Sequence, residues 1–238
     1  MSRLLAIALF ALAFAAPTAA IAGQKAESIA ITPGSKRAAI IIKSQSIPPP
    51  PTMASGFHLT FAAYDPQAEA LASGFFSGSY RLLAKPKLFY DGYLVSDIKP
   101  GTYIVQEFTR QDRWALCYNE ASRVFTVKPG EALYLGEFDS IGSLRALEGE
   151  VSKSMRFFSV GGALVHFFDV APPLFKPIAE GEIEKVQAFV TARMPRTTSP
   201  VTPAVFSTGR FGTGSDLFGT NKVCGGYYKG SAKPKPKA

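Results

Sequence analysis

The sequence predicts an all-β fold, a sandwich of seven or more strands with one accessory helix. Apolar and polar residues alternate with a period of two in several segments, of which residues 57–64 are the clearest. An Asp-Gly pair and two Lys-Pro-Gly phrases mark tight turns between β-forming segments. Turns that recur every ten to fifteen residues or so favour a sandwich or barrel over alternating strands and helices.

The individual strands are predicted from short segments rich in β-branched and aromatic residues. From Phe57 onward every second residue is apolar, while His58 and Thr60 fall on the opposite, more polar face. The pair Asp91-Gly92 between apolar flanks predicts a hairpin. The predicted hairpin covers residues 88–95, and the predicted strands cover residues 28–32, 38–44, 57–64, 79–84, 102–108, 114–118, 124–127, 132–138, 155–160 and 163–170.

Two phrases, Lys99 to Gly101 and Lys128 to Gly130, repeat the sequence Lys-Pro-Gly. Each predicts a type II turn, because Pro fixes φ near −65° at the first central position and Gly accepts the positive φ of the second. Each turn ends one strand and begins the next. No longer stretch recurs at a fixed period, so the phrases indicate shared turn chemistry and not a repeat protein.

Residues 179–195 carry the signals of one helix, with apolar residues at helical spacing, Arg193 in the last turn and Pro195 just beyond. Glu180, Glu182 and Glu184 fall in its first turn. Favourable interaction with the helix dipole accounts for these acids, and residues two apart on a helix do not face each other as a pair of glycosidase carboxylates would.

The phrases "DIKPGTYIVQEF" and "RVFTVKPGEALYLGEF" resemble the small prealbumin-like or carboxypeptidase-regulatory-like β-sandwich modules of secreted bacterial proteins. They are similar in particular to uncharacterised bacterial envelope domains, over about residues 28–139. The resemblance implies a prealbumin-like sandwich and a largely non-catalytic role. It supplies no functional residue, and the chain after Asp139 lies outside it.

Residues 1–22 have the features of a cleaved secretory signal peptide: Arg3, an apolar run from Leu4 to Ala16, and the small-residue site Ala20-Ile21-Ala22 before Gly23. An uncleaved membrane anchor is the alternative, but the apolar run is shorter than the ~20 residues that span a bilayer. The sequence therefore predicts a chain exported to the periplasm or beyond, with no transmembrane span after processing.

Export affects the interpretation of the two cysteines, Cys117 and Cys224. In an oxidising compartment, two thiols in apolar surroundings usually pair, so the sequence predicts a Cys117–Cys224 disulfide. The alternative is two separate buried thiols.

Charge divides the chain after residue 22 into two parts, a β-sandwich body at 23–190 and a basic Gly/Pro-rich segment at 191–238 that ends in a disordered tail. The body holds seventeen basic and seventeen acidic residues, whereas the segment has a net charge of +7. An anionic envelope surface, or an envelope protein, is a more plausible partner than nucleic acid. The candidate contacts to such a surface are Lys229, Lys233, Lys235 and Lys237. A solubilising tail without a partner is the alternative.

Evidence for catalysis is weak, and no cofactor or metal is expected. The histidines are His58 and His166, and the second falls on an apolar face, which favours a buried, hydrogen-bonded residue over a catalytic base. A triad could still assemble from a histidine, Asp169 and a serine, either Ser77 or Ser215. The sequence thus favours a non-catalytic exported binding or structural module of the bacterial cell envelope. The alternative is a periplasmic hydrolase, which requires a pocket that gathers a histidine, a carboxylate and a hydroxyl.

Overall fold

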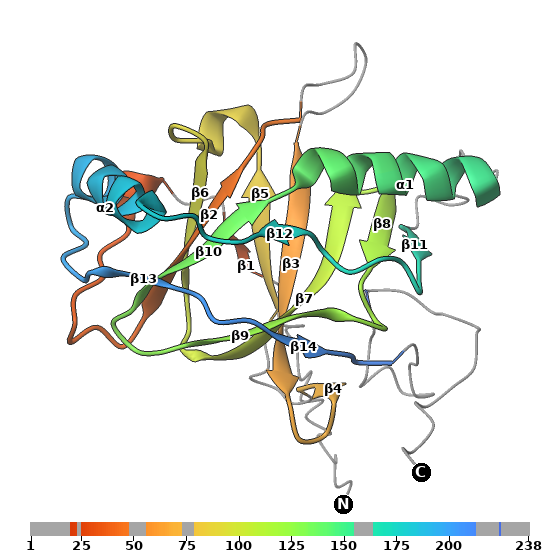
Figure 1. Cartoon of the computed structure of the whole chain (residues 1–238), viewed down its shortest axis with the longest axis horizontal. Helices are drawn as coiled ribbons and strands as arrows, with labels where there is room; N and C mark the ends of the chain where they lie inside the picture. The colour runs from red at the N-terminus through yellow and green to blue at the C-terminus, as the bar shows by residue number, and fades with distance from the viewer. Residues whose placement is uncertain are drawn as a thin grey trace, which may run out of the picture.

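The computed structural model describes residues 20–22, 25–47, 56–72, 79–154 and 164–212 together with Cys224. Most of its strands belong to two sheets that lie against each other, and two α-helices flank them (Figure 1). The predicted class, a β-sandwich with accessory helix, is confirmed. The narrower resemblance to prealbumin-like modules stays a prediction.

The large sheet has nine strands. Its main path runs β1 (Ala20–Ala22), β5 (Ser79–Ala84), β3 (Phe57–Asp65), β7 (Gly101–Arg110), β8 (Trp114–Cys117) and β11 (Val165–Phe167). Three strands join beside this path: β4 (Ala70–Leu71) pairs with β3, β9 (Ser122–Val127) pairs with β7, and β14 (Ser207–Gly209) pairs with β9. Most pairs are antiparallel, but the end strands β1 and β11 run parallel to their neighbours.

The small sheet has five strands, in the order β12 (Phe175–Lys176), β10 (Ala132–Phe138), β2 (Ala38–Ser44) and β6 (Tyr93–Ile98), with β13 (Val201–Pro203) also on β10. Strand β10 runs parallel to both β2 and β13. This sheet therefore unites segments from nearly the whole described chain.

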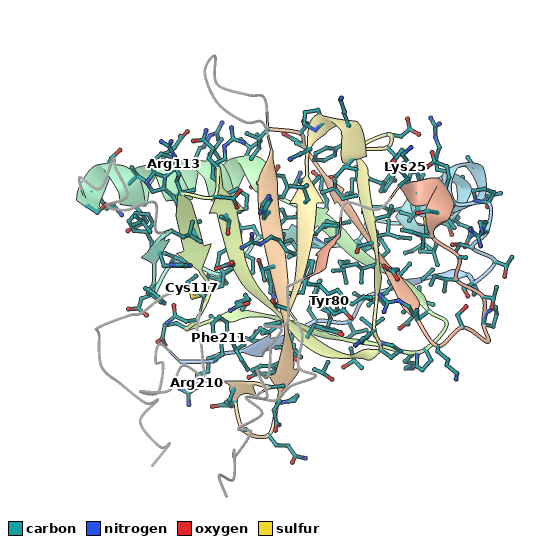
Figure 2. All side chains as sticks on the ribbon, turned by 180° about the vertical axis from the view of Figure 1, so that it is seen from behind. Lys25, Tyr80, Arg113, Cys117, Arg210 and Phe211 are labelled. Atoms are coloured by element: carbon teal, nitrogen blue, oxygen red, sulfur yellow. A yellow bond between two sulfur atoms is a disulfide. The ribbon has the colours of Figure 1, made fainter. Side chains whose placement is uncertain are left out.

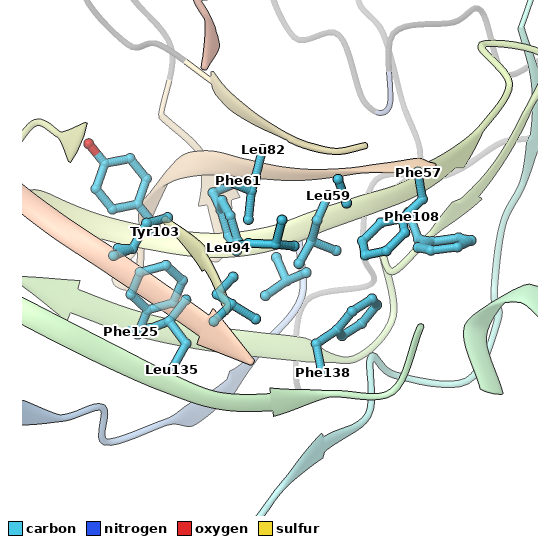
Figure 3. Packing of buried hydrophobic residues seen from close by; sticks show 14 of the residues in the cluster. Phe57, Leu59, Phe61, Leu82, Leu94, Tyr103, Phe108, Phe125, Leu135 and Phe138 are labelled. Carbon is cyan, nitrogen blue, oxygen red and sulfur yellow. The ribbon is translucent and has the colours of Figure 1, made fainter. Parts of the chain in front are cut away.

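The main hydrophobic core fills the space between the sheets (Figure 3). Phe57 of β3 packs against Phe108 of β7, with ring centroids 5.2 Å apart, and against Phe138 of β10 at 5.9 Å. All three rings are essentially inaccessible to solvent. Phe57 comes from the apolar face that the period-two pattern predicted for residues 57–64, and Phe108 and Phe138 come from predicted strands.

Helix α1 (Ser140–Ser154) was not predicted and adds a second helix to the predicted accessory helix. Leu147 is buried in the main core, and Ile141, Leu144 and Val151 pack against it from the same side of the helix. The side chain of Asp139 accepts a hydrogen bond from the Gly142 N–H at 2.8 Å, as a helix N-cap does. Helix α1 thus covers one end of the core beside β8.

Helix α2 (Glu182–Arg193) lies where the sequence placed it. Its apolar residues Val186, Phe189 and Val190 pack on the outer face of the small sheet. Ile29 and Ile31 join this second core. Residues 28–32, however, do not form the predicted strand: a 3₁₀ helix, η1 (Ala26–Ser28), precedes an extended stretch that is in no sheet.

The predicted turns form to different degrees. Asp91 and Gly92 both have positive φ, as in a type I′ hairpin turn. The first strand of the predicted hairpin does not form, because residues 86–88 are a 3₁₀ helix, η2 (Pro86–Leu88). Only the single bridge Tyr90–Tyr93 closes the turn at the start of β6. Lys128–Glu131 forms the predicted turn with φ +70° at Gly130. Gly101 instead has φ +153° and begins β7, so the two phrases do not adopt one conformation.

The first part of the basic segment belongs to the sandwich, since β13 pairs with β10 and β14 pairs with β9. The predicted disordered tail after Cys224 lies outside the described residues, as do most of the predicted signal peptide and the strand predicted at 155–160. The predicted cleavage motif, residues 20–22, is β1 at the edge of β5. None of the helices in the described ranges is long and apolar enough to cross a bilayer.

Candidate functional site

Buried polar side chains gather on the face of the large sheet that points away from the main core. His58 pairs across strands with Thr109, Thr109 with Ala115, and Ala115 with His166. Both histidines therefore lie in one row across four strands, separated by two small residues. The neighbouring row contains Thr60, Glu107 and Cys117. We call His58, Thr60, Glu107, Thr109 and His166 the outer polar cluster.

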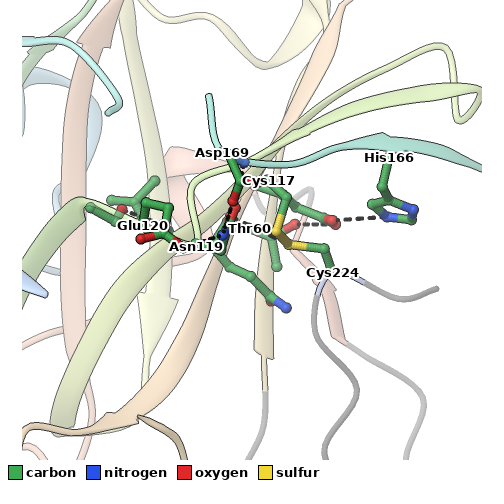
Figure 4. The surroundings of a disulfide bond; sticks show 11 residues. Thr60, Cys117, Asn119, Glu120, His166, Asp169 and Cys224 are labelled. Atoms are coloured by element: carbon green, nitrogen blue, oxygen red, sulfur yellow. Dashed lines mark hydrogen bonds and ion pairs between the residues drawn. A yellow bond between two sulfur atoms is a disulfide. The ribbon is translucent and has the colours of Figure 1, made fainter. Parts of the chain in front are cut away.

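Glu107 is the centre of the outer polar cluster. The Thr60 hydroxyl donates to Glu107 Oε1 at 3.2 Å, and His166 Nε2 lies 3.4 Å from Glu107 Oε2 (Figure 4). Only 6 % of the Glu107 side chain and 5 % of the His166 side chain are exposed. A register shift in β3–β7 after Thr60 places Glu107 opposite Thr60 and leaves Gln106 as the extra residue. The bulge thus aims the carboxylate outward, between a hydroxyl and an imidazole.

Several polar atoms in the outer polar cluster lack a hydrogen-bond partner within the described residues. They are His58 Nδ1, Glu107 Oε2, Thr109 Oγ1 and His166 Nε2. Buried polar groups are nearly always hydrogen-bonded because an unpaired one keeps its desolvation cost. The ion contact between His166 and Glu107 compensates part of that cost whenever the imidazole is protonated.

His58 has a different electrostatic environment from His166. Its side chain is 14 % exposed, and burial lowers the pKa of the imidazole, which the carboxylate of Asp112, 3.4 Å away, opposes. The positive charges of Arg81 and Lys85 lower this pKa further, while the Glu107 carboxylate raises it slightly. The folded chain therefore favours neutral His58.

The predicted disulfide is present beside the outer polar cluster. Cys117 and Cys224 are bonded, with their Cα atoms 6.0 Å apart, and Cys117 is the cross-strand partner of Glu107. Both cysteines are fully buried in a small apolar cluster with Tyr64 and Phe211. Cys117, Arg210 and Phe211 lie on the same part of the molecule (Figure 2). The bond therefore holds Cys224 against the outer face of the large sheet.

Asp169, the acid nominated for a triad, binds Asn119 and not a histidine. The Asn119 side chain donates to Asp169 Oδ1 at 2.8 Å and accepts from the Asp169 N–H at 2.9 Å. The two serines nominated with it, Ser77 and Ser215, lie outside the described residues. The backbone carbonyl oxygen of Asn119 also accepts a hydrogen bond from the Phe211 N–H at 3.0 Å. This buried residue therefore links three segments of the chain.

The order of groups in the outer polar cluster determines what chemistry it can perform. In nucleophilic catalysis the imidazole stands between the hydroxyl and the carboxylate, so that it can remove the hydroxyl proton. Here Glu107 stands between Thr60 and His166, so the imidazole does not reach the hydroxyl directly. The cluster links β3, β7 and β11. In the described part of the chain, no group of three or more His, Cys, Asp or Glu side chains is placed to hold a metal.

The sequence predicted part of this site. It placed His58 on the polar face of its strand and His166 in a buried setting, and both placements are correct. The hydrogen bond expected for His166 is not confirmed, since its buried Nε2 has no hydrogen-bond partner among the described residues. It did not single out Glu107, although an acid between the apolar residues Val105 and Phe108 of a predicted strand is an available signal. The predicted surface contacts Lys229, Lys233, Lys235 and Lys237 lie beyond the residues that the structure describes.

Comparison with known proteins finds no matching family, no matching curated protein and no matching solved structure.

Proposed function

We propose that this chain is a non-catalytic exported module of the bacterial cell envelope that presents its basic tail to an anionic envelope surface. One observation carries the proposal: the disulfide holds Cys224 on the outer face of the large sheet. The residues that follow Cys224 include Lys229, Lys233, Lys235 and Lys237 and no acid. The basic tail therefore starts from a fixed point on the body.

Export is supported by the same disulfide, because such bonds persist in oxidising compartments and are rare in the cytosol. Processing after Ala22 would remove β1 from the edge of β5. Intact-mass measurement of the protein from the periplasm of an expressing cell should give a chain that begins at Gly23. A periplasmic protein that keeps residues 1–22, or a protein confined to the cytosol, would contradict the proposal of a cleaved signal.

The tail is tested by co-sedimentation with vesicles that contain an anionic phospholipid. The mature chain should sediment with them, and a chain that ends at Gly230 should bind more weakly. Each Lys near an anionic surface contributes up to about 1 kcal/mol, so removal of three should lower affinity by one to two orders of magnitude or so. Binding should fall as salt is raised because the Debye length shrinks.

A variant with Lys233, Lys235 and Lys237 replaced by Gln provides the matched control, since it keeps the length of the tail and removes its charge. It should behave like the truncated chain, and neutral vesicles should bind none of the three proteins. Equal binding of the full and truncated chains, or binding that does not change with salt, would show that the tail is not the contact.

A periplasmic hydrolase is the second candidate, and one observation favours it: a hydroxyl, a carboxylate and an imidazole do meet in the outer polar cluster. If Glu107 were a catalytic base, Glu107→Gln would abolish hydrolysis of an activated ester such as p-nitrophenyl acetate. We expect the variant and the original chain to show the same background rate. A large loss of ester hydrolysis in Glu107→Gln with the fold intact would favour the hydrolase.

A further inference from the structure

A pocket of about 330 Å³ lies on the face of the small sheet that also carries α2. Its lining includes residues 28–31, residues 35–37 and Asp97. Lys25, shortly before the first of these, lies toward the opposite end of the molecule from Cys117 (Figure 2). The pocket is therefore distinct from the outer polar cluster and from the start of the basic tail. Its volume is at the lower end of the range for ligand pockets, about 300–1,000 Å³.

One wall of the pocket is a stretch of extended backbone with a free hydrogen-bonding edge. Thr197 Oγ1 donates to the Ile29 carbonyl oxygen at 3.1 Å, and the Thr198 N–H donates to the Ile31 carbonyl oxygen at 2.8 Å. Successive peptide groups of an extended chain point to opposite sides. The N–H and C=O of Ala30 therefore point away from residues 197–199, and they make no hydrogen bond to another described residue.

This edge is too short to accept a long strand. The 3₁₀ helix η1 ends at Ser28, and at the other end Thr32 and Ser35 close a turn in which the Ser35 N–H donates to the Thr32 carbonyl oxygen at 2.9 Å. Between these two features only Ala30 presents a free N–H and C=O. The pocket can therefore pair with only one residue of an extended chain.

The charges in the pocket favour a carboxylate. Arg37 Nε lies 2.5 Å from Asp97 Oδ2, which occupies one edge of the guanidinium. The other edge carries the terminal nitrogens, which make no ion pair or hydrogen bond with another described residue, and 41 % of the Arg37 side chain is exposed. Guanidinium groups bind carboxylates in a two-pronged geometry. Lys36 also lines the pocket and is exposed, so the lining carries a net charge of +1.

We propose that this pocket binds the carboxyl-terminal end of an extended peptide. The backbone of the peptide pairs with the N–H and C=O of Ala30, and its terminal carboxylate binds the free edge of the Arg37 guanidinium. This combines strand addition with capture of a chain terminus, two established modes of peptide recognition. Because the pocket lies apart from Cys224, the described residue from which the basic tail starts, this proposal is independent of binding to an anionic surface.

The test is an NMR titration of the isotope-labelled full chain with acetyl-trialanine that ends in a free carboxylate, alongside the same peptide with a terminal amide. The free acid should shift the amide signal of Ala30 and the side-chain signals of Arg37, and it should bind roughly tenfold or more tightly than the amide. Arg37→Gln should weaken binding of the free acid to the level of the amide.

Asp97→Asn serves as the matched variant, since it breaks the same ion pair but keeps the guanidinium, and it should retain or strengthen binding. Arg193→Gln, in the exposed pair with Asp91, should have no effect. Thermal unfolding of each variant checks the fold. Equal binding of acid and amide, unchanged binding by Arg37→Gln, or no shift at millimolar peptide would overturn the proposal. Shifts at Arg37 that acetate reproduces without any change at Ala30 would also overturn it, in favour of a simple anion site.

Discussion

At the scale of single residues, the outer polar cluster places buried polar side chains on the face of the large sheet opposite the main core. His58 and Glu107 both belong to strands whose alternate residues form the main core. The sheet register brings their side chains to the same outer face. Burial and the neighbouring charges therefore determine the pKa of His58, which burial lowers.

His58 should make the stability of the fold depend on pH. Its pKa is lowered from about 6.5 by burial, so the unfolded chain binds a proton more readily than the folded chain. The free energy of unfolding should therefore be highest above pH 6.5 and should decrease as pH falls toward the folded pKa. In the variant His58→Gln, the free energy of unfolding should decrease less over this pH range. Urea unfolding at a series of pH values measures the two slopes, and parallel slopes would contradict the assignment.

At the scale of elements, α2 is held on the small sheet by apolar packing and by one short polar link. The Tyr134 hydroxyl of β10 donates to Glu182 Oε1 at 2.6 Å, and burial together with the nearby Glu182 carboxylate raises the pKa of Tyr134. Glu182 also accepts a hydrogen bond from the Ala179 N–H at 3.0 Å. The Glu182 carboxylate thus stabilises the first turn of the helix and links the helix to the small sheet.

Tyr134→Phe should lower the free energy of unfolding by about 1.5 kcal/mol, the typical contribution of a hydrogen bond to a charged group. Tyr93→Phe is the matched control, because Tyr93 lies on the same face and its hydroxyl makes no hydrogen bond to another described residue. This control should cost less than about 0.5 kcal/mol. Chemical denaturation measures both, and equal losses would show that the Tyr134–Glu182 bond contributes nothing specific.

The strands inside the sheets could be predicted from the sequence because their signal is local. Residues 38–44, 79–84 and 132–138 form strands with the predicted bounds. Helix α1 was missed although Asp139 is a suitable N-cap and apolar residues follow it at helical spacing. Its glycines and serines have low helix propensity, and packing on the core compensates for this.

The pairing of strands and the contents of the candidate sites could not be predicted in the same way. That β10 lies parallel to β2, or that His166 meets Glu107, depends on which distant segments become neighbours. Local periodicity carries no information about this choice. The disulfide is the exception, because two cysteines leave a single pairing within the chain.

At the scale of the whole molecule, the disulfide joins the last described residue to the edge region of the large sheet. It spans 107 positions of sequence and is fully buried. Cross-linking residues this far apart restricts the unfolded chain strongly. The bond therefore acts on stability mainly through the unfolded state.

Loss of the disulfide should lower the free energy of unfolding by about 2–5 kcal/mol, with the chain-entropy model giving the upper end. The Cys117→Ala, Cys224→Ala double variant and the reduced original chain should unfold at similar, lower urea concentrations. The single variant Cys117→Ala separates packing effects from the cross-link. An unchanged midpoint after reduction would show that the cross-link does not restrict the unfolded chain.

The small sheet also affects when the chain can fold. Ser44 at the end of β2 donates a hydrogen bond to the carbonyl oxygen of Phe138 across 94 positions of sequence, and β13 joins β10 only at residues 201–203. Parallel pairing of distant strands is slow because loop closure comes before any gain from contacts. The sheet cannot be completed until most of the chain has been synthesised. A nascent chain of this topology therefore stays unfolded for longer, which would suit the proposed export through a narrow translocation channel.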